Sequence, residues 1–128
     1  MNDLWSVGKE TELISFTITE TEIVLYEQLL THSDLPENNE LLKIPYTYPS
    51  LFWQYFKIPW LKKEEPIILV EQTFLYENTL LCDLTYTAKI VLTKVKKFHD
   101  QTFLFHDLYV YLQDKKQMTM KCTFLLKE

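Results

Sequence analysis

The chain has 128 residues, 47% of them hydrophobic and 15% aromatic, which suits one folded domain over residues 1–128 and excludes disorder. Its 18 acidic residues outnumber its 13 basic ones, all lysines, and the net charge of −5 argues against a nucleic-acid partner. No apolar run approaches the roughly 18 residues of a membrane-spanning helix, and the first residues lack a secretory pattern, so we expect a cytoplasmic protein without membrane insertion.

The first helix is predicted by a capping box. Residues 13–18 have the pattern of a short extended segment, and Thr19 follows with Glu22 three positions later, as at a helix N-terminus. Apolar residues then recur at helical spacing as far as about Thr31. A loop rich in turn-forming residues comes next, over residues 33–39.

A second helix is predicted between prolines. Pro45 and Pro49 exclude regular helix between them, but Pro49 suits the first turn of a new helix, and Pro59 ends it. Residues 51–56 are apolar on nearly every side of this helix. Such a helix is predicted to be buried all round.

The second half of the chain has the composition and the period of an antiparallel sheet. The predicted strands are residues 67–76, 84–95, 103–112 and 118–126, with breaks short enough for hairpin loops between the last three. One face of such a sheet is apolar and must be covered, and the second helix is the obvious cover. We therefore predict an α+β fold of hot-dog architecture, in which an antiparallel sheet wraps around a central buried helix.

No motif in the sequence predicts a cofactor or a metal. The single glycine, Gly8, excludes the glycine-rich loops that bind nucleotide phosphates. Cys82 and Cys122 lie far apart, and His99 and His106 do not stand at metal-ligand spacing, so we expect no metal site. We expect the two cysteines to be reduced and buried.

Four stretches occur in an order that is similar to one known family: residues 16–23 (FTITETEI), 44–49 (IPYTYP), 69–76 (LVEQTFLY) and 80–83 (LLCD). Together they resemble the MaoC-like dehydratase branch of hot-dog proteins, and more closely its non-catalytic N-terminal half or subunit. The order and spacing fit over nearly the whole chain. The resemblance implies an acyl-CoA or acyl-carrier thioester as ligand, no cofactor, and a pair of hot dogs as the working unit.

The loop that carries catalysis in this family departs from the pattern here. Active members have D-x-N-P-x-H, whose aspartate and histidine supply the acid–base groups that remove water from a 3-hydroxyacyl thioester. The corresponding residues 32–39 read HSDLPENN. Asp34 matches the aspartate, but no histidine follows it, and Cys82 replaces the family's turn glycine. The resemblance therefore implies a chain whose catalytic motif is incomplete.

Four polar residues are candidates for the site, and each has a plainer interpretation. Asp34 is either a remnant of the acid–base pair or a turn cap. Asn38 either binds a thioester carbonyl or forms a turn, and Gln72 bonds either that carbonyl or a neighbouring backbone group. Glu71, on the opposite face of its strand, is either the carboxylate of a thioesterase-like site or a solvent-facing side chain.

The aromatic residues around the second helix exceed what one thin layer covers, and such residues recur at interfaces and in ligand tunnels. Among them we take Tyr48 and Trp53 as candidate substrate contacts. We favour a non-catalytic hot-dog subunit that binds an acyl thioester or shapes the acyl tunnel for a catalytic partner. Two alternatives stay open: an acyl-CoA thioesterase with Asp34 or Glu71 as base, and a homodimer that binds an acyl thioester without turnover. The choice between homodimer and heterodimer stays open as well.

Overall fold

A five-stranded antiparallel sheet is the framework of the fold. Its strands are β1 (Ile14–Thr17), β2 (Ile67–Tyr76), β3 (Thr85–Phe98), β4 (Gln101–Leu112) and β5 (Lys115–Lys127), in the spatial order β1-β3-β4-β5-β2. Two helices accompany it, α1 (Glu20–Leu30) and the 3-10 helix η2 (Tyr48–Tyr55). The structure is a computed structural model, and it describes residues 6–30, 43–61 and 67–127.

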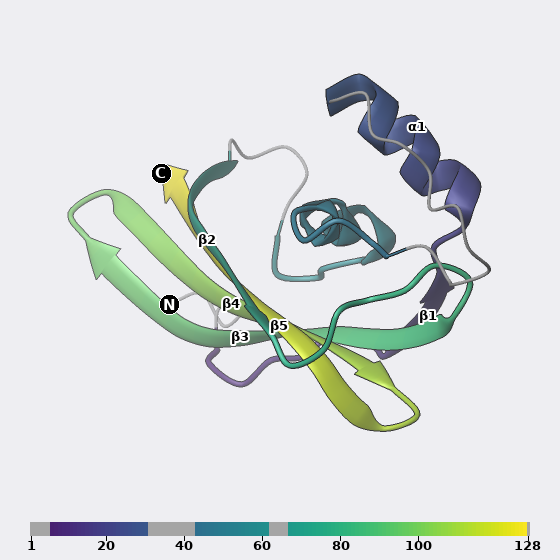
Figure 1. The fold of residues 1–128 in the computed structure, drawn as a ribbon. Coiled ribbons are helices and arrows are strands. Elements are labelled where there is room, and N and C mark those ends of the chain that lie inside the picture. Colours follow the sequence, from purple (N-terminus) through teal and green to yellow (C-terminus); the bar gives the residue numbers. More distant parts are fainter. Residues whose placement is uncertain (1–5, 31–42, 62–66, 128) are drawn as a thin grey trace.

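The sheet is curved, and η2 lies in its hollow, with α1 on the same side (Figure 1). We call the face toward η2 the inner face and the opposite face the outer face. Phe52 of η2 is fully buried, and its ring lies 4.7 Å from that of Phe16 on β1. The predicted hot-dog arrangement, a sheet wrapped around a central helix, is confirmed.

The strands follow the alternation that the sequence predicts. Alternate residues of β4, of β5 and of β3 as far as Leu92 are mostly buried on the inner face, where apolar side chains form the core beneath η2. Regular pairing shifts at Val70 in β2 and at Thr93 in β3. Such bulges bend strands, which fits a sheet that curls around a helix. The inner-face residues of the three long strands are Tyr86, Ala88, Ile90, Leu92, Leu104, His106, Leu108, Val110, Met118, Met120, Cys122 and Leu126.

The central helix differs from the prediction in type and in burial. Its backbone hydrogen bonds run from residue i to residue i−3, as from Ser50 N–H to the Thr47 carbonyl and from Phe56 N–H to the Trp53 carbonyl. Pro49 has no N–H to donate to the carbonyl four residues back, which favours the tighter winding. The expectation of burial all round is wrong, because Leu51 is 39% exposed.

Helix α1 begins where the capping box predicts. Glu22 N–H donates to Thr19 Oγ1 over 3.3 Å, and Ile23 is fully buried in the core. No helix among the described residues is both long and apolar enough to cross a membrane. Cys82 and Cys122 are buried and unbonded, as expected.

Candidate functional site

The structure separates the four polar candidates. Asp34 and Asn38 lie outside the described residues, so the predictions for them stay predictions. Glu71 lies on β2 opposite Thr123, on the outer face, and its side chain is exposed. Gln72, the next residue, points to the inner face. Glu71 and Gln72 therefore belong to opposite sides of the sheet and cannot act on one substrate atom.

Gln72 has weak hydrogen-bond partners. Its side-chain amide donates to the sulfur of Met120 over 3.3 Å and to the sulfur of Cys122 over 3.4 Å. Sulfur is a weak acceptor, so the amide is only partly satisfied. Its place on the inner face, half-buried beside the core, suits a residue that meets a ligand or a partner chain.

Tyr48 is tied into the contact between α1 and η2. Its hydroxyl donates to Glu22 Oε2 over 3.4 Å, and its ring meets that of Tyr26 edge-on at 4.9 Å. Burial, together with the nearby Tyr55 and Glu22, raises the pKa of Tyr48 well above its ordinary value. The hydroxyl therefore stays protonated and joins the two helices. Its contacts among the described residues are structural.

Trp53 lies in an aromatic cluster beneath η2, formed by Trp53, Trp60, His106 and Phe124. The Trp53 ring meets Phe124 at 4.8 Å and His106 at 5.4 Å, both in T-shaped contacts, and His106 lies 5.1 Å from Phe124. Trp60 stacks on His106 at 6.0 Å and donates its indole N–H to His106 Nε2 over 2.9 Å. This cluster fills the space between the end of η2 and strands β4 and β5.

His106 is a neutral histidine. Burial lowers its pKa to about 4, although the nearby backbone carbonyls of Leu104 and Cys122 and the carboxylate of Asp107 act the other way. Nε2 accepts the proton of Trp60, so the ring's own proton is on Nδ1. Nδ1 has no hydrogen-bond partner of good geometry among the described residues, and neither does the buried Nε1 of Trp53.

Trp53 and Gln72 are the two candidates that the structure brings together. Both lie near the Cys122 thiol and act to lower its pKa, against the larger effect of burial, which raises it. The inner face beneath Trp53 is thus lined by apolar groups and by hydrogen-bond donors. These donors have weak acceptors or no acceptor of good geometry among the described residues. Sequence reasoning missed the bond of His106 to Trp60, because the two residues lie 46 positions apart.

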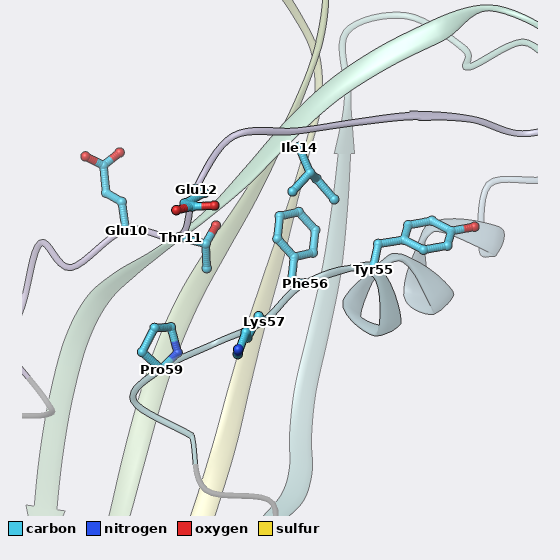
Figure 2. Close-up of a pocket in the computed structure, with 8 residues that line it drawn as sticks. All are labelled: Glu10, Thr11, Glu12, Ile14, Tyr55, Phe56, Lys57 and Pro59. Atoms are coloured by element: carbon cyan, nitrogen blue, oxygen red, sulfur yellow. The ribbon is translucent and has the colours of Figure 1, made fainter.

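A separate hollow of about 430 Å³ lies between residues 10–14 and the segment 55–59 that follows η2 (Figure 2). Its lining is mixed, with Glu12 and Lys57 beside the apolar Ile14 and Phe56. Glu10 at its rim forms an ion pair with Lys89 at 2.6 Å. None of the described candidates lines this hollow, and no group of metal-ligating side chains occurs in the described segments.

The unpaired edge of β2 is a second candidate for a functional surface. β2 is the last strand of the sheet, so one of its two sides has no strand beside it among the described residues. Four consecutive apolar residues at its start, Ile67–Val70, are between 37% and 52% exposed. An apolar strand edge of this kind is the usual template for pairing with another chain.

No protein-family model and no curated protein matches the sequence. Solved structures do match the fold. A chain of the HadBC (3R-hydroxyacyl-ACP dehydratase) complex from Mycobacterium tuberculosis is 14% identical with a TM-score of 0.79, and the match covers 93% of this chain and 96% of that one. A MaoC-like dehydratase from Rhodospirillum rubrum is 9% identical with a TM-score of 0.72, covering 96% and 93%.

A mutant of the fluoroacetyl-CoA-specific thioesterase FlK is similar as well, at 13% identity and a TM-score of 0.65, covering 94% of this chain and 87% of that one. At such identities the likeness shows the fold. The chain has the hot-dog fold, and in fold it resembles the MaoC-like dehydratases. Because a thioesterase shares the same fold, the fold alone does not choose between the two chemistries.

Proposed function

We propose that this chain is a non-catalytic hot-dog subunit, one domain over residues 1–128, that pairs with a second hot-dog chain. In the pair it binds an acyl thioester or shapes the acyl tunnel, while the partner supplies the aspartate and histidine. The free apolar edge of β2 is the observation that carries the proposal. The two free cysteines are in keeping with the cytoplasm as its compartment.

Pairing is supported by what β2 exposes. A strand edge presents unpaired backbone N–H and C=O groups, and protein edges are normally protected by charged residues or proline. Here Ile67–Val70 carry no charge and are exposed. Antiparallel addition of a partner's strand satisfies the backbone groups and covers these side chains. Among the similar structures, HadBC is itself described as a complex.

The absence of catalysis is supported by the histidines. The loop that matches the family's catalytic segment has no histidine after Asp34. His106 accepts from Trp60 and stays neutral near pH 7, so it has no lone pair free to take a proton from a substrate. His99 lies in the exposed turn between β3 and β4. Neither described histidine therefore replaces the missing one.

The alternative of a thioesterase gains nothing from the structure. Its described candidate, Glu71, is exposed on the outer face and is not among the residues that line the hollow between residues 10–14 and 55–59. A general base must come within hydrogen-bond reach of the water that it activates beside the bound thioester. The non-catalytic role is therefore the function that the geometry supports best.

The test is turnover by the chain with and without a partner. The chain is purified alone and co-expressed with a hot-dog chain that carries D-x-N-P-x-H. Hydration of crotonyl-CoA is followed by loss of enoyl absorbance, and hydrolysis by thiol release. We expect turnover only from the pair, and we expect it to vanish when the partner's histidine is replaced by alanine.

Turnover by the pure chain at an ordinary enzymatic rate, on the order of 1 s⁻¹ or more, would refute the non-catalytic role. In that event Asp34→Asn and Glu71→Gln identify the base. Glu77→Gln is the matched control, because Glu77 is an exposed carboxylate just beyond the end of β2, held by Lys116 at 3.5 Å.

A further inference from the structure

Trp53 is packed in a way that leaves its polar atom unsatisfied. The residue is only partly buried, yet its indole N–H is wholly buried and has no hydrogen-bond partner among the described residues. The Cys122 thiol is near but forms no hydrogen bond of good geometry with it. A buried donor without an acceptor opposes burial. Rotation of the indole toward solvent restores its hydration, so the packed position of Trp53 is held by ring contacts alone.

The residues under Trp53 also include hydrogen-bond donors that are poorly satisfied. His106 is 1% exposed, and its Nδ1–H has no hydrogen-bond partner of good geometry among the described residues, although the backbone carbonyls of Leu104 and Cys122 lie near the ring. Gln72 offers its amide only to two sulfur atoms. Donors therefore collect beneath the indole, beside the apolar Phe124 and Met120. A ligand that brings an apolar chain and one acceptor oxygen complements this surface better than the indole does.

The helix that carries Trp53 is of a type suited to movement. η2 continues as a 3-10 helix for eight residues, whereas runs of this kind are usually three or four residues long because their hydrogen-bond geometry is poorer than that of an α-helix. Thr47 at its start makes no side-chain capping bond. The end that carries Trp53 passes directly into non-helical residues 56–58. Beyond Phe56, whose N–H donates to the Trp53 carbonyl over 3.2 Å, the helical winding has ended.

We propose that the Trp53 indole is a gate that turns outward and admits the acyl group of a thioester beneath η2, where the acyl oxygen accepts a hydrogen bond from His106 Nδ1. The class of ligand rests on the function proposed above. The gate itself rests on the geometry of Trp53 and His106. Because the interior is close-packed, the acyl group that fits is about the size of the displaced indole, on the order of eight carbons.

The first test uses the indole N–H as a probe. In nitrogen-15 spectra of the chain, purified with its partner if it has one, Trp53→Phe assigns the Trp53 signal among the three tryptophans. Octanoyl-CoA is then titrated. We expect the Trp53 signal to move to the position of a hydrated indole, while the Trp60 signal, bonded to His106, moves much less. Binding of octanoyl-CoA without movement of the Trp53 signal refutes the gate.

The second test opens the gate permanently. Trp53→Ala is expected to bind octanoate and octanoyl-CoA at least tenfold more tightly than the wild type, measured by calorimetry. Leu51→Ala is the matched control, on the same helix but 39% exposed, and should bind as the wild type does. Equal affinity of wild type and Trp53→Ala refutes the gate but leaves the proposed function standing. No binding by any of these proteins refutes both the gate and the acyl-binding role.

Discussion

The inner face of the sheet and the free edge of β2 carry similar apolar side chains in opposite situations. On the inner face, isoleucine, leucine and methionine lie fully buried beneath η2. At the start of β2, Ile67–Val70 have between 37% and 52% of their surface exposed. The first region is completed within the chain, and the second lacks a cover. We take the difference to mean that one region maintains the fold and the other awaits a partner.

This distinction separates the expected effects of substitution. Changes beneath η2 should reduce the free energy of unfolding. They should reduce pairing only as far as they reduce the fraction of folded chains. Changes at the edge of β2 should leave the free energy of unfolding nearly unaltered and abolish pairing. The predictions below use that contrast, from the largest effect on stability to the smallest.

Phe52→Ala should have the largest effect. Phe52 is fully buried, and its ring lies 4.7 Å from Phe16 and 6.1 Å from Tyr48. Its loss leaves a cavity at the centre of the core, so we expect the free energy of unfolding in urea to fall by about 3–5 kcal/mol. Leu51→Ala, its exposed neighbour, should cost less than about 1 kcal/mol. Equal effects would show that η2 is not packed as described.

Acid should destabilise the protein through His106. The folded pKa of about 4 is below the ordinary 6.5, so the unfolded chain takes up the proton first as the pH falls. Stability is then lost between about pH 6.5 and pH 4, by on the order of 3 kcal/mol for a shift of this size. Urea unfolding at several pH values measures the loss.

The control for this prediction is the second described histidine. His106→Gln cannot titrate and should flatten the dependence on pH in this range. His99→Asn alters an exposed turn residue at φ 57°, a conformation that asparagine tolerates, and should keep the wild-type dependence. If His106→Gln and the wild type lose stability in parallel, the acid effect has another source.

Thr19→Ala should have a smaller effect. Thr19 Oγ1 accepts the N–H of Glu22 at the start of α1 over 3.3 Å. Loss of an N-cap of this kind costs about 1 kcal/mol. Thr19→Ser keeps the hydroxyl and should stay within about 0.5 kcal/mol of the wild type in thermal or urea unfolding. A Thr19→Ala variant as stable as the wild type would mean that the cap contributes nothing.

The double change Ile68→Lys and Val70→Lys should have the smallest effect on stability. Both side chains are about half exposed, at 47% and 52%, so the folded monomer loses little contact. We expect a change in the free energy of unfolding below about 1 kcal/mol. The same charges protect natural strand edges from pairing, so the assembly should be lost.

The sequence predicts what local patterns determine. Alternation along β3, β4 and β5 is a local property, and so is the capping pair of Thr19 and Glu22, and both are confirmed. The 3-10 winding of η2 was not predicted, because apolar spacing over eight residues does not separate it from an α-helix. The free edge of β2 depends on which strand lies beside it, which no local pattern shows.

The candidate site was predicted less completely for the same reason. Trp53 and Gln72 were named from the sequence and lie close together, but the partner that explains the site, His106, is brought there by the pairing of β4 with β5. No spacing pattern in the sequence predicts its hydrogen bond to Trp60. Tyr48 joins α1 to η2, and its contact with a substrate stays a prediction. Asp34 and Asn38 stay predictions.

The molar mass in solution, measured by light scattering across a range of concentrations, tests the central claim most directly. The wild-type chain should have the mass of two hot-dog chains, either two copies or one copy with its co-purified partner. The double lysine variant of β2 should have the mass of one folded chain, while Leu25→Lys, an exposed change on α1, should pair as the wild type does. A single-chain mass for the wild type under every condition, or full pairing by the double lysine variant, would contradict the account.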